Sequence, residues 1–178
     1  MNVAVIDARP SLKAYLMGHL PGAQPLVVDS TRSASGGVPG VLSPWETLSL
    51  VIHRLGISRS TPVVVNGEES DIDATYVADV LRISGVAQVS VLDGGFERWT
   101  AEKRPVTKER RAVPLTNDTL LPDAKALVGL EDVRAAVEKK SALLLDMRPA
   151  EPYAAGHLPP GSASLTSSEM APRLPYGH

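Results

Sequence analysis

Aspartate, arginine and histidine recur with nearly the same spacing near both ends of the sequence. The two sets are Asp7, Arg9 and His19, and Asp146, Arg148 and His157. Each aspartate ends a short apolar run that has the character of a buried parallel strand. A guanidinium at a strand end could bind an anion, but it could also form a structural ion pair or a hydrogen bond to a neighbouring loop, and we favour this structural role for Arg9. We expect the aspartates and histidines to stabilise turns through side-chain-to-backbone hydrogen bonds.

A second group of polar residues follows an apolar run in the middle of the chain. The candidate ligand-binding residues are Asn66, Gly67, Glu68, Glu69, Ser70 and Asp71, together with Arg9. The acidic side chains of this loop would repel an anionic ligand, and their spacing fits no Ca²⁺-binding loop. Ser70 could act as a nucleophile only with a base within reach, and we expect His19 in a turn and His53 on a helix. We favour a solvated loop in which Asp71 or Asp73 caps the following helix.

The composition excludes several classes of function. The chain has 178 residues, a net charge of -2 and no cysteine. The absence of cysteine excludes disulfides, thiolate metal sites and cysteine nucleophiles in this chain. Lysine and arginine do not cluster as nucleic-acid binding requires, and no apolar run is long enough for a membrane span. With no sign of a signal peptide, we expect a cytoplasmic protein without a metal or cofactor.

Apolar runs alternate with amphipathic segments, which predicts a parallel α/β sheet covered by helices. The expected strands are Val3–Asp7, Pro25–Asp29, Thr61–Val65 and Val89–Leu92. The expected helices are Leu12–Met17, a helix that Ser43 caps and Gly56 ends, Ala74–Ile83 and Phe96–Ala101. Residues 30–42 are rich in serine and glycine and are expected to form a surface loop.

The distance between the two copies of the Asp-Arg-His motif has the size of a domain and indicates domain duplication. We expect a first domain at residues 1–107, a linker at 108–125 and a partial second domain at 126–178. Residues 108–111 are charged and are expected to be solvated. The second domain is expected to contain a strand near 126–128, a helix at Glu131–Lys139 and a strand at Leu143–Asp146.

Together these motifs resemble the tandem rhodanese family, which contains thiosulfate and 3-mercaptopyruvate sulfurtransferases. The resemblance covers residues 3–107 and again 126–165. Its main elements are Asp7-Ala8-Arg9, Gly18-His19-Leu20-Pro21-Gly22-Ala23, Thr61-Pro62-Val63-Val64-Val65, Val91-Leu92-Asp93-Gly94-Gly95-Phe96 and Trp99. The resemblance implies a parallel five-stranded sheet flanked by helices, followed by an incomplete second rhodanese-like unit.

The resemblance also implies a chemistry that this chain lacks. Family enzymes carry a cysteine directly after the strand that corresponds to Val63–Val65, and its thiolate takes a sulfane sulfur from a donor such as thiosulfate. Here Asn66 occupies that position, and an amide is not a usable sulfur nucleophile. The first domain of a tandem pair in this family is often the silent one. A phosphatase related to the rhodaneses would need the same cysteine and is excluded.

Two functions are therefore expected. The first is a catalytically silent domain with a structural, regulatory or anion-binding role, for which thiosulfate or another small anion is the candidate ligand. The alternative is the N-terminal part of an active thiosulfate or 3-mercaptopyruvate sulfurtransferase whose catalytic cysteine lies beyond residue 178. In either case we expect the partial second domain to pack on the first domain, on a protein partner or on a second copy.

Overall fold

The computed structural model of the chain describes residues 3–68, 72–123, 125–157 and 162–164. The chain divides into two compact units, Met1–Ala126 and Leu127–His178. Within the described residues, no helix is both long and apolar enough to cross a membrane.

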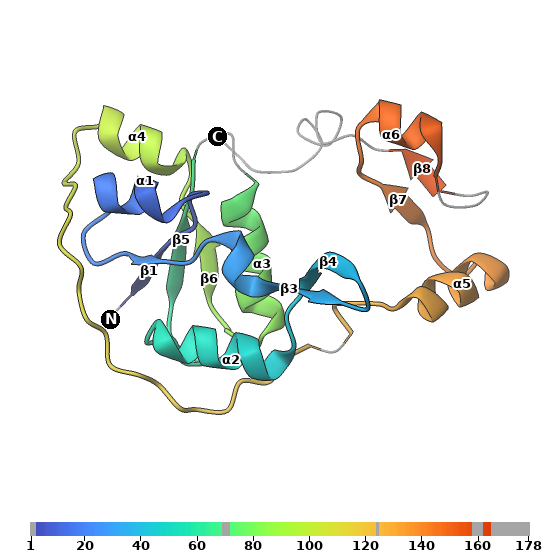
Figure 1. Cartoon of the computed structure of the whole chain (residues 1–178), viewed down its shortest axis with the longest axis horizontal. Helices are drawn as coiled ribbons and strands as arrows, with labels where there is room; N and C mark the ends of the chain where they lie inside the picture. Colours follow the sequence, from blue (N-terminus) through green and yellow to red (C-terminus); the bar gives the residue numbers. More distant parts are fainter. Residues whose placement is uncertain (1–2, 69–71, 124, 158–161, 165–178) are drawn as a thin grey trace. The chain divides into compact units, whose positions relative to one another are not determined.

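The first unit is built on a parallel sheet of four strands in the order β2-β1-β5-β6 (Figure 1). The strands are β1 (Ala4–Asp7), β2 (Gln24–Pro25), β5 (Val63–Asn66) and β6 (Val89–Val91). The described residues thus contain four of the five strands expected for this sheet. The central strands β1 and β5 are short apolar runs, as expected for strands buried on both faces.

Helices cover both faces of this sheet. They are α1 (Leu12–Met17), α2 (Trp45–Arg54), α3 (Asp73–Ile83) and α4 (Gly95–Ala101). One core cluster joins Ile6 of β1 to Ile52 of α2 and Val77 of α3. A smaller cluster on the other face contains Tyr15 of α1 and is completed by Phe96 of α4. The parallel α/β architecture predicted from the sequence is therefore confirmed.

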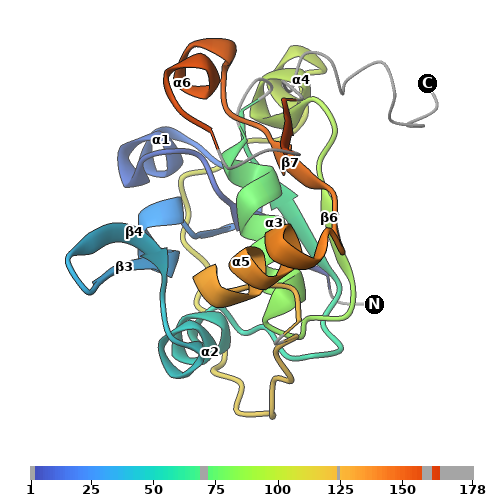
Figure 2. The same ribbon diagram turned by 90° about the vertical axis from the view of Figure 1, so that its right-hand side faces the viewer.

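Two predictions for residues 25–42 are wrong. The strand expected at Pro25–Asp29 is limited to β2, and Val28–Thr31 forms the 3-10 helix η1, in which the Thr31 hydroxyl donates to the Val28 carbonyl. The expected loop at 30–42 contains an antiparallel hairpin of β3 (Arg32–Ser35) and β4 (Val38–Leu42) (Figure 2). Gly36 and Gly37 both have positive φ, 56° and 81°, so the glycines that suggested a loop form a tight hairpin turn.

Other local expectations also need correction. Pro44, not Ser43, is the N-cap residue of α2, and no side chain caps that helix. The expected strand near 126–128 is absent, and these residues form bends and irregular backbone. The expected helix and strand of the second unit are confirmed as α5 (Leu130–Lys139) and β7 (Leu144–Asp146). The second unit continues with α6 (Ala150–Ala155) and β8 (Ser162–Ser164), which pairs with β7 in parallel.

Residues 105–123, called the strap below, run along the first unit without forming a helix. Thr107 forms a β-bridge with His19. Further along, the Thr116 hydroxyl donates to the Ile57 carbonyl at 2.6 Å. Leu120 is buried in the main core. The strap thus includes most of the expected linker and is part of the first unit, although its charged residues 108–111 are exposed.

Candidate functional site

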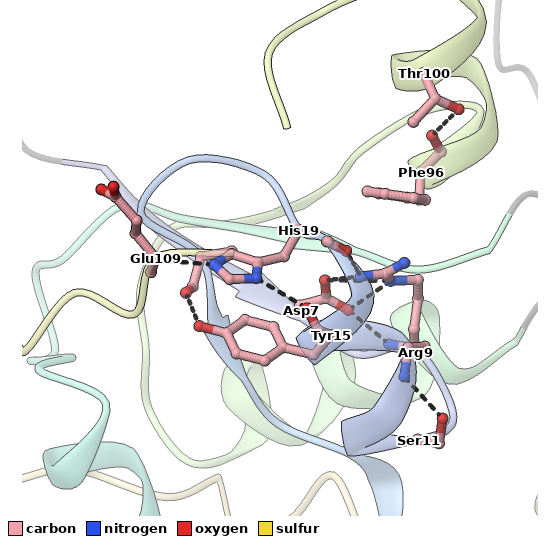
Figure 3. A network of polar contacts seen from close by, with 11 residues as sticks. Asp7, Arg9, Ser11, Tyr15, His19, Phe96, Thr100 and Glu109 are labelled. Atoms are coloured by element: carbon pink, nitrogen blue, oxygen red, sulfur yellow. Dashed lines mark hydrogen bonds and ion pairs between the residues drawn. The ribbon is translucent and has the colours of Figure 1, made fainter. Parts of the chain in front are cut away.

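The carboxyl end of β1 carries a buried ion pair between Asp7 and Arg9 (Figure 3). Arg9 Nη2 donates to Asp7 Oδ2 at 2.8 Å, and Arg9 Nε donates to Asp7 Oδ1 at 3.0 Å. The same Nη2 also donates to the Gly18 carbonyl at 2.6 Å. The guanidinium carbon lies 3.8 Å from the centre of the Phe96 ring, which allows a cation–π interaction. Arg9 therefore ties β1 to the turn after α1 and to α4.

His19 lies beside this pair and is fully buried. Its Nδ1 lies 2.9 Å from the Tyr15 carbonyl oxygen, and its Nε2 lies 3.2 Å from the Glu109 carbonyl oxygen of the strap. The imidazole stacks on the Tyr15 ring with 3.8 Å between centroids. Burial raises the pKa of Tyr15, whose hydroxyl donates to the Ala23 carbonyl. Because both ring nitrogens face backbone oxygens, His19 holds the turn and the strap and is not free to act as a base.

Asn66 ends β5 and pairs in register with Asp7. Its backbone carbonyl accepts a hydrogen bond from the Ala8 amide at 2.8 Å. The side chain is fully buried, and neither its Oδ1 nor its Nδ2 has a hydrogen-bond partner among the described residues. A buried amide without partners is destabilising. The sequence identified this position as the place of the missing nucleophile, but it contained no sign of this unpaired state.

Gly67 follows Asn66 where three elements meet. A Cβ at this position would lie 2.7 Å from the Ala74 Cβ of α3, and the Gly67 carbonyl accepts the Phe96 amide of α4 at 2.8 Å. Glycine is therefore required by the close approach of α3. Glu68 is partly exposed, whereas the candidate residues Glu69, Ser70 and Asp71 lie outside the described residues.

The structure brings the candidate residues Arg9, Asn66 and Gly67 to one edge of the sheet. This edge is the carboxyl end of parallel strands, where ligands bind in open α/β folds. The contact between Arg9 and Phe96 was not foreseen, because the two residues are far apart in the sequence and no local pattern links them. Among the described residues, no three histidine, aspartate or glutamate side chains are close enough to hold a metal ion.

The second unit repeats the contacts of the first around Asp146. Arg148 Nη2 donates to Asp146 Oδ2 at 2.6 Å and to the Gly156 carbonyl at 2.8 Å. His157 stacks on Tyr153, and its Nδ1 lies 3.1 Å from the Tyr153 carbonyl oxygen. In both units the strand that ends in aspartate pairs with a strand 18 residues further along. The copies differ in burial, because the arginine side chain is 6% exposed in the first and 50% exposed in the second.

The pKa of Asp146 provides a direct test of this second contact. Hydrogen bonds from the Arg148 side chain and backbone lower the pKa of Asp146 from 3.8 to about 2. The contact therefore stabilises the second unit above pH 3.8, and its contribution is lost as the pH falls from 3.8 to about 2. We expect the Asp146 carboxyl carbon to titrate in NMR with a midpoint near 2. In Arg148→Ala the midpoint should rise towards 3.8, and an unchanged midpoint would contradict the assigned hydrogen bonds.

Comparison with known proteins assigns the fold to a family. The family described as "Rhodanese-like domain" matches residues 1–102. A putative thiosulfate sulfurtransferase of Synechococcus elongatus is 31% identical over 165 residues, which are 89% of this chain and 52% of that protein. The thiosulfate sulfurtransferase of Bos taurus is 31% identical over 166 residues, 91% of this chain and 55% of that protein. The chain thus spans about half the length of these two relatives.

Comparison with a solved structure supports the same family. The crystal structure of SseA from Escherichia coli, a 3-mercaptopyruvate sulfotransferase, superimposes with a TM-score of 0.86 and 25% identity, covering 95% of this chain and 70% of that one. The family match extends over more than half of the chain and includes the Asp7–Arg9 pair, Asn66 and Phe96. The chain therefore belongs to the rhodanese sulfurtransferase family.

Proposed function

We propose that this chain is a catalytically silent member of the rhodanese family with a structural or regulatory role. The proposal rests on the presence of Asn66, instead of a cysteine, at the position of the family's nucleophile. Asn66 stands at the carboxyl end of β5, where the family resemblance implies a cysteine, and the sequence contains no cysteine elsewhere. An amide cannot form a persulfide, so the sulfur-transfer step has no acceptor atom on this chain.

The contacts of Arg9 favour a structural role over anion binding. Its Nε and Nη2 donate to Asp7 and Gly18, and its guanidinium lies over Phe96. The cation is thus neutralised and largely enclosed by the protein. Anion binding, including binding of thiosulfate, remains a prediction, as do a cytoplasmic location and a protein partner.

We also propose that residues 127–178 form an incomplete second rhodanese-like unit. The repeated ion pair, the repeated ring stack and the equal strand spacing support this proposal. The alternative function follows from it and from the relatives, because a sulfurtransferase could contain this chain as its N-terminal part. In that case the catalytic cysteine would lie beyond residue 178 and the present residues would serve as its scaffold.

Assays of sulfur transfer test the proposal that this chain has no sulfurtransferase activity. We expect the purified chain to show no turnover above a buffer blank with thiosulfate and cyanide or with 3-mercaptopyruvate and a thiol. Asn66→Cys should restore little activity, because the side chain at this position is fully buried and desolvation disfavours the thiolate form of a cysteine. The bovine thiosulfate sulfurtransferase serves as the positive control for the thiosulfate assay.

Turnover by the unmodified chain would refute the proposal that it is catalytically silent. Robust turnover by Asn66→Cys alone would show that the rest of the site is competent and that only the nucleophile is missing.

A further inference from the structure

The strap is attached to the C-terminal end of α2 and to the turn that follows this helix. The Thr116 amide donates to the His53 carbonyl at 3.2 Å, and the Thr116 hydroxyl donates to the Ile57 carbonyl at 2.6 Å. Asp118 continues this attachment, because its Oδ2 accepts a hydrogen bond from the Arg59 amide at 2.8 Å. Each of these hydrogen bonds uses a backbone group of residues 53–59, so together they hold the strap against the end of α2.

One further contact between the strap and α2 is incomplete. The Nε2 atom of His53 lies 3.8 Å from Oδ1 of Asp118, which is beyond the usual length of a hydrogen bond. Both atoms are buried, and neither has a hydrogen-bond partner among the described residues. Because unsatisfied buried polar atoms are destabilising, a change that joins these two atoms would strengthen the attachment of the strap.

We propose that protonation of His53 joins these two atoms and makes the His53–Asp118 pair a pH-sensitive latch between α2 and the strap. A neutral imidazole donates from only one of its nitrogens, whereas an imidazolium donates from both. The protonated Nε2 donates a charge-assisted hydrogen bond to Asp118 Oδ1, while Asp118 Oδ2 keeps the Arg59 amide. Histidine is the side chain that ordinarily changes its charge between about pH 5 and pH 8.

The direction of the effect follows from the form of His53 that gains a partner. The carboxylate of Asp118 attracts the imidazolium when the strap is attached, and this attraction is lost when the strap detaches. The latch therefore stabilises the attached strap in acid, and its contribution is lost as the pH rises and His53 is deprotonated. Because none of its groups belongs to the site at Asn66, the latch is independent of sulfur transfer.

The charges around His53 favour Asp118 as its partner. The other charged side chains on α2 and on the segments beside it are Glu46 and Arg54 of α2, Asp29 of η1 and Arg59 of the following turn. All four are exposed. Among the residues that the structure describes, Asp118 is the only acidic residue within ion-pair distance of the His53 imidazole. The His53 side chain is 19% exposed, so protons can reach the ring from water.

Hydrogen exchange at the Thr116 amide measures the attachment of the strap, because this amide donates to the His53 carbonyl. After correction for the intrinsic pH dependence of exchange, we expect its protection in the full chain to rise about fivefold from about pH 8 to about pH 5. His53→Gln and Asp118→Asn should each abolish this increase, and the double variant should behave like either single variant. Asparagine at position 118 retains an oxygen for the Arg59 amide, so this variant removes the charge alone.

Asp29→Asn is the matched control, because it removes an exposed carboxylate of η1 that does not pair with His53. This variant should retain the increase in protection. A wild-type chain whose Thr116 protection does not change with pH would overturn the proposal. An increase that persists in His53→Gln or in Asp118→Asn would also overturn it, since another group would then be responsible. Loss of the increase in Asp29→Asn would assign the effect to the general charge around α2 and would equally contradict the latch.

Discussion

Arg9→Ala is expected to lower the free energy of unfolding of the first unit by about 3–5 kcal/mol, which is the usual cost of removing one partner of a buried ion pair. The substitution leaves the Asp7 carboxylate buried at 1% exposure without its guanidinium. It also removes the hydrogen bond to Gly18 and the contact with Phe96. Urea unfolding followed by tryptophan fluorescence measures this change, because Trp45 and Trp99 both lie in the first unit and no other tryptophan is present.

Arg148→Ala is the matched control for this experiment. The same hydrogen bonds to aspartate and to a glycine carbonyl are lost, but the Arg148 side chain is 50% exposed. The Asp146 side chain is itself only 6% exposed, but removal of the half-exposed guanidinium opens it to water, so the loss should be smaller than for a fully buried pair. The tryptophan-detected transition should stay at the wild-type urea concentration. Both tryptophans lie in the first unit, so this transition reports on that unit only. An unchanged transition in Arg9→Ala as well would show that the contacts of Arg9 do not stabilise the first unit.

Gly85→Ala is expected to destabilise the first unit by about 3 kcal/mol or more, because two costs combine. Gly85 has a φ of +101°, which L-residues rarely adopt, and a Cβ there would lie 2.6 Å from the Leu121 carbonyl oxygen of the strap. Since the obstacle is backbone, the strap must move. Its movement would withdraw Leu120 from the core, where this residue is only 8% exposed. Urea unfolding with tryptophan fluorescence measures this loss.

Gly37→Ala separates the two costs of Gly85→Ala. Gly37 has a φ of +81°, and a Cβ there would meet nothing within 4 Å. This variant therefore suffers the backbone strain alone, roughly 1–2 kcal/mol. Equal losses for Gly37→Ala and Gly85→Ala would mean that the contact between Gly85 and the strap contributes nothing. Faster hydrogen exchange at the Asp123 amide, which donates to the Ile83 carbonyl at 2.8 Å, would confirm that the strap has moved in Gly85→Ala.

The elements predicted correctly are those with a strong local pattern. The run of β-branched valines before Asn66 favours a buried strand, and the apolar spacing of Asp73–Ile83 fits a single helix face. The errors fall where local chemistry is ambiguous. Gly36 and Gly37 are equally compatible with a loop and with the hairpin that forms. The strap resembles a linker in composition, but it packs on the first unit, where Leu120 is buried in the core.

The two Asp-Arg-His motifs show where inference from local residues ends. Residue types and spacing were enough to indicate the family, a structural role for Arg9 and the missing nucleophile at Asn66. They could not reveal that Arg9 is enclosed while Arg148 is half exposed, because both arginines have nearly the same neighbours in the sequence. Nor could they show that the Asn66 amide lacks partners. The burial of a side chain depends on which distant segments pack over it. Phe96 covers Arg9, and Ile6 is buried in a core cluster that includes Val65 of β5. In the second unit, by contrast, β7 pairs only with β8 among the described residues.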